Sequence, residues 1–209
     1  MGGNRLLGVV QRCQEHAGLP FDEVEPEKFY SGYDHGWCCV VRNYDFRRKV
    51  GDTLLYSALD ERDPRQQKFL LLQGSAGAGK SIALRRAAYD AATALDEVVV
   101  WLKETGQPRA EVFEELFGLT GKRVLLFVDR VSMHCDAICN LIRRLSSKNI
   151  PFTIIAAERE ADWASHCGAL EELFPPDLHF LKKLSEREAE DLVDLLDRHN
   201  CLGLLQKKS

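Results

Sequence analysis

The sequence has no long hydrophobic run, no strong excess of charge and no repeated or low-complexity segment. No apolar stretch in the 209 residues reaches the length of about 18 that a membrane-spanning helix requires. Lys and Arg number 28 and Asp and Glu number 32, so the net charge of −4 gives no general attraction to nucleic acid. The hydrophobic share of 45% and the charged share of 29% are typical of folded globular chains. These features exclude membrane spans, collagen, coiled coils and disorder, and they predict one ordinary domain with a small appendage.

Paired cysteine motifs are also missing. The seven cysteines are odd in number and irregularly spaced, and no two of them form a CxxC pair. His134, Cys135 and Cys139 can share one face of a helix, but a zinc site needs a further pair of ligands. We therefore interpret the cysteines as ordinary buried or half-buried thiols. Because the apolar stretch 6–10 is too short for the core of a signal peptide, we expect a cytoplasmic chain with reduced thiols.

Apolar and turn-forming residues alternate in a way that predicts strands separated by helices. The predicted strands are short and apolar, as expected of strands covered on both faces, and they span 69–72, 98–102, 124–128, 152–156 and 178–181. Predicted helices span 4–16, 45–60, 80–94, 108–118 and 133–147, with Gly118 as the stop of the fourth. Residues 17–36 are predicted to be irregular. Ser185 and Glu188 form a capping box that opens a last helix, to residue 199.

One segment carries a chemical motif. Gly74–Ser81 matches GxxxxGK[ST] and lies between a predicted strand and a helix, which is the context that a phosphate-binding loop requires. Glycines let backbone N–H groups point at phosphate oxygens, and the helix N-terminus adds partial positive charge. Lys80 is predicted to reach the β and γ phosphates, and the Ser81 hydroxyl to bind Mg²⁺. The residues predicted to bind the nucleotide here are Gly74, Ser75, Ala76, Gly77, Ala78, Gly79, Lys80 and Ser81.

The motif and the alternating elements together predict an α/β fold. We expect a P-loop NTPase, with three layers (α/β/α) around a mainly parallel sheet. Three parts are predicted along the chain: a helical and irregular lead-in over 1–64, the P-loop core over 65–182, and the start of a helical lid over 183–209.

An acidic residue at the end of an apolar strand is the second element of such a site. Asp129 follows the strand 124–128 and is predicted to hold Mg²⁺ through water, so that Ser81 and Asp129 are the predicted metal ligands. The strand 98–102 separates the two motifs along the chain, which favours the P-loop branch with an added strand between them. No NKxD sequence follows, so GTP is disfavoured, and ATP or ADP with Mg²⁺ is the predicted ligand.

Arg159, which follows the strand 152–156 after a short extension, is the third candidate. In this branch a polar residue at that place lies beside the γ-phosphate, so we expect Arg159 to sense it. Glu158 is a weaker candidate, either to polarise water or to pair with Arg159. The predicted catalytic residues are Lys80, Asp129 and Arg159.

The residue after Asp129 departs from the pattern of an efficient ATPase. It is Arg130, where a hydrolytic glutamate often stands, and Asp136 lies further along the next helix. Without an adjacent base, the attacking water is poorly polarised. We therefore expect a weak ATPase, with tight nucleotide binding and slow or partner-dependent hydrolysis.

These motifs resemble the STAND class of P-loop ATPases, which are switch proteins related to AAA+ ATPases. The resemblance rests on the phosphate-binding loop, Val124–Asp129, Arg159 and the lid-like segment 184–189. The lead-in, with aromatic residues at 29, 30 and 37 and the segment Tyr44–Arg47, is similar to that of the novel STAND NTPase modules of prokaryotic antiviral defence proteins. In such modules the lead-in covers the adenine, so the resemblance implies that the base is bordered by Tyr44, Asp45 and Arg47.

The resemblance further implies a regulatory switch, in which ADP holds a closed monomer and ATP with a trigger favours a homo-oligomer. A ligand can shift such an equilibrium only by its differential affinity for the two states. Effector and sensor domains accompany such modules, and this sequence contains neither. We therefore expect a central module of a larger signalling or antiviral defence protein.

Two other functions stay open on the sequence. A small-molecule kinase suits the length, although no acceptor site or arginine-paired lid is evident. A nucleic-acid-linked ATPase would use basic residues, and the pairs at 85–86, 143–144 and 182–183 are the candidates. We interpret these pairs as solvated helix faces, so nucleic acid is not an expected partner of this chain alone.

Overall fold

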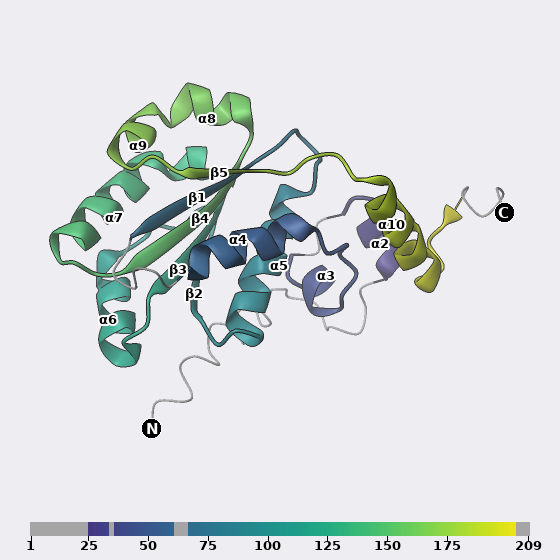
Figure 1. Cartoon of the computed structure of the whole chain (residues 1–209), viewed down its shortest axis with the longest axis horizontal. Coiled ribbons are helices and arrows are strands. Elements are labelled where there is room, and N and C mark those ends of the chain that lie inside the picture. The colour runs from purple at the N-terminus through teal and green to yellow at the C-terminus, as the bar shows by residue number, and fades with distance from the viewer. Residues whose placement is uncertain (1–24, 34–35, 61–66, 204–209) are drawn as a thin grey trace. The chain divides into compact units, whose positions relative to one another are not determined.

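The computed structural model describes residues 25–33, 36–60 and 67–203 (Figure 1). The chain forms two compact units. The larger unit is Lys49–Lys182, and the smaller unit joins the described residues up to Arg48 with those from Lys183 onward. The helix expected over 4–16 lies outside the described residues.

A parallel sheet forms the centre of the larger unit. Its strands are β1 (Lys68–Gln73), β2 (Val98–Leu102), β3 (Val124–Asp129), β4 (Phe152–Glu158) and β5 (Asp177–Phe180). Their order is β2-β3-β4-β1-β5, and every neighbouring pair is parallel. A strand does separate β1 from β3, but it is β4; β2, which intervenes along the chain, lies at an edge. Crossover helices let a parallel sheet skip positions, so chain order alone does not give the neighbour.

Helices cover both faces of this sheet, which confirms the predicted three-layer α/β/α fold (Figure 1). One face carries α4 (Lys49–Leu59) and α5 (Lys80–Thr93). The other carries α6 (Ala110–Thr120), the 3₁₀ turn η1 (Val131–His134), α7 (Cys135–Ser147), α8 (Glu160–His166) and α9 (Gly168–Leu173). None of the helices in the described ranges combines the length and the apolar character needed to cross a membrane.

Strand composition explains this layering. Successive side chains of a strand point to opposite faces, so a strand covered on both faces must be apolar throughout. In β1, Phe69 and Leu71 join the core under α6 to α9, whereas Leu70 and Leu72 are equally buried on the other face. Every residue of β1 and β4 is buried. β5 is mostly exposed because it is an edge strand.

Three helix predictions need correction. α6 runs through Gly118 and ends at Gly121, which has a left-handed backbone (φ 66°) and donates its N–H to the Phe117 carbonyl. A short helix, α2 (Pro26–Tyr30), lies in the segment expected to be irregular, because the proline suits the first helical turn. α4 was assigned to the lead-in, but it belongs to the larger unit, where its buried face packs on α5 and β1.

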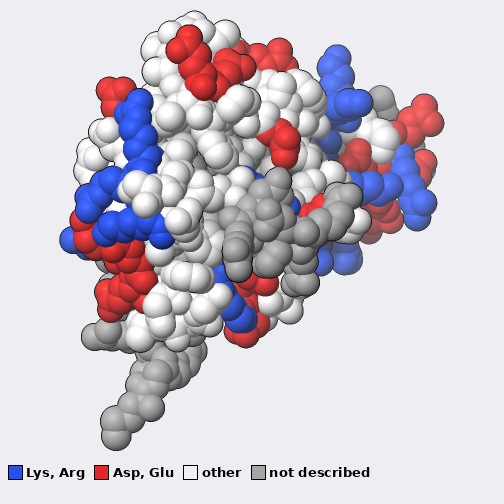
Figure 2. Space-filling view, turned by 60° about the vertical axis from the view of Figure 1, so that its left-hand side comes forward, with Lys and Arg blue, Asp and Glu red and all other residues white. Residues whose placement is uncertain are grey.

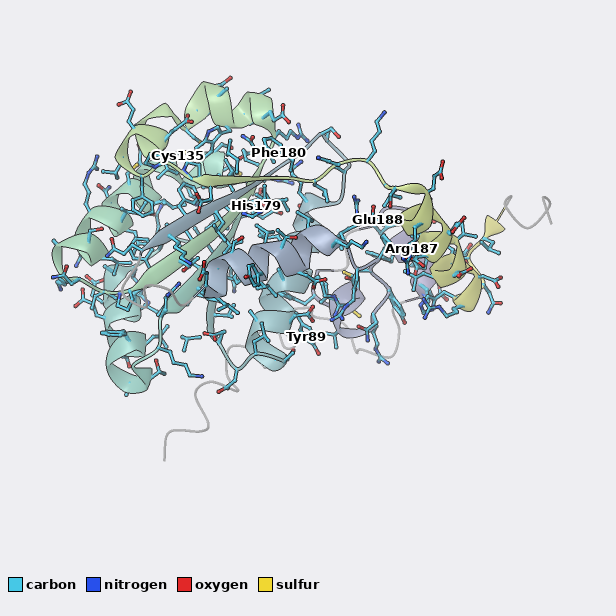
Figure 3. The ribbon with its side chains drawn as sticks, in the orientation of Figure 1. Tyr89, Cys135, His179, Phe180, Arg187 and Glu188 are labelled. Atoms are coloured by element: carbon cyan, nitrogen blue, oxygen red, sulfur yellow. The ribbon has the colours of Figure 1, made fainter. Side chains whose placement is uncertain are left out.

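The smaller unit contains α2, α3 (Cys38–Val41) and α10 (Glu186–Arg198). The predicted capping box of α10 is confirmed. The Ser185 hydroxyl accepts the backbone N–H of Glu188, and the Glu188 carboxylate accepts the backbone N–H of Ser185 at 3.0 Å. Glu188, which is labelled in Figure 3, also pairs with Arg48 at 3.2 Å. This carboxylate therefore ties the first turn of α10 to the lead-in within the smaller unit.

Candidate functional site

The glycine motif forms the loop between β1 and α5. Gly77 and Gly79 have positive φ angles of 72° and 93°, which residues with a side chain rarely adopt. Gly74 is needed for a different reason. A Cβ atom there would lie 3.2 Å from the carbonyl oxygen of Leu181, the residue that follows β5. The loop can therefore curl tightly at the start of a helix, where backbone N–H groups have no partner within the helix.

Lys80 begins α5, and its ammonium group folds back over the loop. Its Nζ donates to the carbonyl oxygens of Gly74 and Ser75, each at 2.9 Å. Burial lowers the pKa of Lys80, and the Arg159 guanidinium lowers it further. Such an ammonium group is partly desolvated and held in place, as a cradle for an anion requires.

Charged residues from the carboxyl ends of β3 and β4, and from the start of α8, act electrostatically on Lys80. The carboxylates that act to raise its pKa are Glu158, Asp129 and Asp162, and Arg159 opposes them. This convergence follows from the sheet, since β4 lies between β1 and β3 and all three strands end at the same edge. The three predicted catalytic residues are thus brought to one place.

Asp129 is the last residue of β3 and is half-buried. Arg130, which follows it, has a left-handed backbone (φ 52°), and its guanidinium pairs with Glu104 at 2.9 Å on the surface. Asp136 is exposed on the first turn of α7. Ser81 and Asp129 offer a hydroxyl and a carboxylate, which are the hard oxygen ligands that Mg²⁺ prefers. The donor set therefore fits the metal expected with a nucleotide.

Glu158 does not pair with the Arg159 side chain, which was one of the two roles expected of it from the sequence. Glu158 is only 4% exposed, and its carboxylate accepts the backbone N–H of Ser132 at 2.8 Å and that of Arg159 at 2.9 Å. It thus clamps the end of β4 to the turn after β3 instead of pairing with the Arg159 side chain. The Arg159 side chain is exposed and lies 3.9 Å from Asp162. A carboxylate at the end of a mostly apolar strand was the sequence signal for this clamp.

Tyr44, Asp45 and Arg47 belong to the smaller unit. The Tyr44 carbonyl accepts the Tyr30 hydroxyl at 2.9 Å, and the Tyr44 ring packs edge-on against His199 at 5.1 Å. Asp45 is buried, and together with Arg47 it lines a pocket that faces α10. Asp45 and Arg47 are therefore brought together around one hollow, while the Tyr44 ring packs among aromatic neighbours.

One member of each of two basic pairs contacts an acidic side chain in the larger unit. Arg86 is 5% exposed, with its guanidinium 3.5 Å from Asp90 and stacked over Tyr89 (labelled in Figure 3). The sequence predicted a solvated helix face here, and for Arg86 this is wrong, because its side chain lies on the packed side of α5. Arg144 pairs with Glu111. On the face in Figure 2, Lys and Arg gather at the left-hand edge and at the right, and in both places Asp and Glu lie beside them.

The family model for novel STAND NTPase 5 matches residues 27–171, more than half of the chain. The chain belongs to this family. The resemblance inferred from the motifs is confirmed, and the chain is a STAND-type NTPase module that binds nucleotide. A comparison with curated proteins gives no match.

This STAND NTPase is also similar to solved structures. The S. cerevisiae Hsp104–ADP complex is 16% identical with a TM-score of 0.50, covering 78% of this chain and 32% of the Hsp104 chain. A RuvB mutant from Thermotoga maritima is also 16% identical, with a TM-score of 0.47, covering 75% of this chain and 54% of RuvB. The STAND NTPase therefore spans only part of these relatives, 32% of the Hsp104 chain and 54% of the RuvB chain. The likeness to Hsp104 shows the P-loop fold alone.

Proposed function

We propose that this module is an ATP-binding switch that hydrolyses ATP slowly, or only with a partner, and drives the assembly of a larger signalling or antiviral defence protein. The observation that carries the proposal is the charged cluster around Lys80. It joins a phosphate-binding loop to carboxylates from β3 and β4 but places no acidic residue directly after Asp129.

Lys80 and the loop would bind the phosphates. The carbonyl oxygens of Gly74 and Ser75 hold the Lys80 ammonium group in the structure described here, and phosphate oxygens would replace them as acceptors. Ser81 and Asp129 would hold Mg²⁺, which, when bound, neutralises charge on the phosphate oxygens. The glycine loop contributes N–H donors from the backbone, which carry no cost of reorganisation.

Slow hydrolysis follows from how the nearby carboxylates are used. Both oxygens of Glu158 accept backbone N–H groups, so this side chain is a poor base for water. Glu104 pairs with Arg130, and Asp136 is exposed on α7. A general base must be within hydrogen-bond reach of the proton it removes. We propose that a partner supplies or positions that base.

Arg159 would make the module sensitive to the γ-phosphate. Its exposed side chain can reorient, and it immediately precedes α8. ATP has a γ-phosphate that Arg159 would contact, and ADP does not. This difference would supply the differential affinity that any switch requires. In the smaller unit, we propose that Tyr44, Asp45 and Arg47 border the base.

The test is isothermal titration of the purified chain with ATP and with ADP, each with Mg²⁺. Lys80→Ala should abolish binding, because the phosphates lose their cationic partner. Lys103→Ala is the matched control, since Lys103 is an exposed lysine outside the loop, and it should bind as the unmodified chain does. Equal binding by both variants would reject the assigned site.

Phosphate release and light scattering on the same samples separate a switch from an enzyme. We expect little turnover, and a change in particle mass with ATP that ADP does not produce. Rapid turnover would show that another base acts beside Asp129. Equal affinity for ATP and ADP with unchanged mass would overturn the switch for this chain.

A further inference from the structure

Two thiols from segments far apart in the chain meet on the face of the sheet that α6 to α9 cover. The sulfur atoms of Cys135 and Cys167 lie 2.8 Å apart. Cys135 is the first residue of α7, and Cys167 lies between α8 and α9. Figure 3 shows Cys135 close to the ribbon of α8 and α9, in agreement with that distance.

The pair bridges the two segments that leave the site. β3 ends at Asp129 and continues through η1 to Cys135, whereas β4 ends at Glu158 and continues through Arg159 and α8 to Cys167. These segments already share one link, because Glu158 accepts the backbone N–H of Ser132 in η1 and that of Arg159. A covalent bond between the sulfurs would add a second link beside this carboxylate.

We propose that Cys135 and Cys167 are a thiol–disulfide site, oxidised by a hydroperoxide and reduced by a dithiol, and that the bond locks the Arg159 segment to the Asp129 segment. The regulatory half of this inference rests on the proposed nucleotide switch. The chemical half, disulfide formation, does not.

The two cysteines have different surroundings that suit the two steps of the reaction. Cys135 is half-buried, whereas Cys167 is wholly buried. The hydrogen bond with Cys167 lowers the pKa of Cys135, and the same bond, together with burial, raises the pKa of Cys167. The more accessible sulfur therefore has the greater thiolate character, which favours reaction with an oxidant.

The reaction balances with the peroxide as the only oxidant. The Cys135 thiolate attacks one peroxide oxygen, so an S–O bond forms, the O–O bond breaks and hydroxide leaves, giving a sulfenic acid. The Cys167 sulfur then attacks the Cys135 sulfur, the S–O bond breaks, and water leaves with the thiol proton. Two thiols are oxidised by two electrons in total, and the peroxide is reduced to water.

The disulfide between Cys135 and Cys167 would change how the module distinguishes ATP from ADP. If Arg159 reports the γ-phosphate by moving with α8, a bond from Cys167 to the segment after Asp129 would restrict that movement. We expect oxidation to reduce the ratio of ATP to ADP affinity, or the turnover of ATP, by about fivefold or more, a typical size for coupling between sites. Reduction with a dithiol should restore the original value.

The first experiment detects the bond without using nucleotide. The full chain is treated with hydrogen peroxide, remaining thiols are alkylated, and peptides are analysed by mass spectrometry. We expect a linked Cys135–Cys167 peptide that disappears in Cys135→Ser and in Cys167→Ser but persists in Cys201→Ser, a half-buried cysteine of the smaller unit. Sulfinic acid on Cys135 without the link, or Cys167 linked to Cys139 instead of Cys135 in the unmodified chain, would overturn the proposal.

The second experiment measures nucleotide affinity and turnover in reduced, oxidised and re-reduced protein. Melting curves of the reduced serine variants check that they fold, and the unmodified chain provides the test if one does not. A linked peptide with unchanged affinities and turnover would overturn the regulatory half alone. If the reduced chain binds no nucleotide, the proposed function fails, while the mass analysis still decides whether the disulfide forms.

Discussion

The hydroxyl of Tyr30 shows how one buried group makes stability depend on pH. It donates to the Tyr44 carbonyl at 2.9 Å. Burial, followed by the negative charges of Cys201 and Asp45, raises the pKa of Tyr30 from 10.0 to about 12. Because the folded value is above the ordinary one, this contribution to stability is complete below pH 10 and is lost as the pH rises toward 12.

Urea unfolding between pH 9 and pH 12 measures this loss. The unmodified chain should lose more unfolding free energy over that interval than Tyr30→Phe, which has no hydroxyl to titrate. Tyr56→Phe is the control, since Tyr56 is 80% exposed, and it should follow the unmodified chain. Parallel curves for all three proteins would show that Tyr30 titrates normally.

Glu158 gives a second test at the residue scale. Glu158→Gln places an NH₂ donor where one of two backbone N–H groups, from Ser132 or Arg159, needs an acceptor. A buried donor without an acceptor costs about 1–3 kcal/mol, so the free energy of unfolding should fall by that amount. Chemical denaturation measures it, with the exposed Glu160→Gln as control. No difference between the two variants would mean that the clamp does not hold the turn.

Residue roles could be predicted only where spacing along the chain determines them. The phosphate-binding loop is one continuous segment, so its position and its lysine were evident from the sequence. The Glu158 clamp depends on a turn 26 residues away along the chain, and on β4 lying beside β3. Likewise, the sequence does not show that Arg86 lies on the packed side of α5.

At the scale of elements, the capping box of α10 predicts a pH-dependent helix. The backbone N–H of Ser185, together with its hydroxyl and Arg48, lowers the pKa of Glu188 below its ordinary 4.5. A lowered carboxyl pKa gives stability that is complete above pH 4.5 and is lost as the pH falls through the folded value. Glu188→Gln should therefore be less stable than the unmodified chain by about 1 kcal/mol at pH 7.

The measurement is the difference in melting temperature between the unmodified chain and Glu188→Gln at several pH values. The difference should shrink below pH 4.5, where the carboxyl group of the unmodified chain takes up a proton. Glu190→Gln, at an exposed position on the same helix, serves as control and should show no such dependence. A difference that stays constant with pH would indicate lost packing, not a lost charge.

The strands were the most predictable elements, because strands covered on both faces must be apolar along their whole length. Their order in the sheet was less predictable, since β4 and not β2 separates β1 from β3. The end of α6 was ambiguous in the sequence, because glycines at 118 and 121 could each end the helix. Gly118 is tolerated inside α6, and Gly121 ends the helix because it adopts the left-handed conformation. The local composition does not show which of the two glycines adopts the left-handed conformation.

At the scale of the whole molecule, the described residues up to Arg48 and those from Lys183 onward form one compact unit. Segments far apart in the chain therefore fold together, and nothing in the local sequence pattern indicates this. The arrangement bears on function because Arg47 belongs to the smaller unit and Lys80 to the larger one. The roles proposed for Arg47 and for Lys80 can therefore be tested separately.

Nucleotide-dependent stability tests both of these proposed roles. A ligand that binds only the folded chain stabilises it by about 2.7 kcal/mol at a hundredfold excess over its Kd. For a chain of this size, that corresponds to a rise in melting temperature of roughly 5–10 °C with Mg-ADP. Lys80→Ala should lose the whole rise, and Arg47→Ala should lose part of it. Arg187→Ala, an exposed arginine of α10 labelled in Figure 3, should keep it. An undiminished rise in Arg47→Ala would confine nucleotide binding to the larger unit and remove the lead-in from the site.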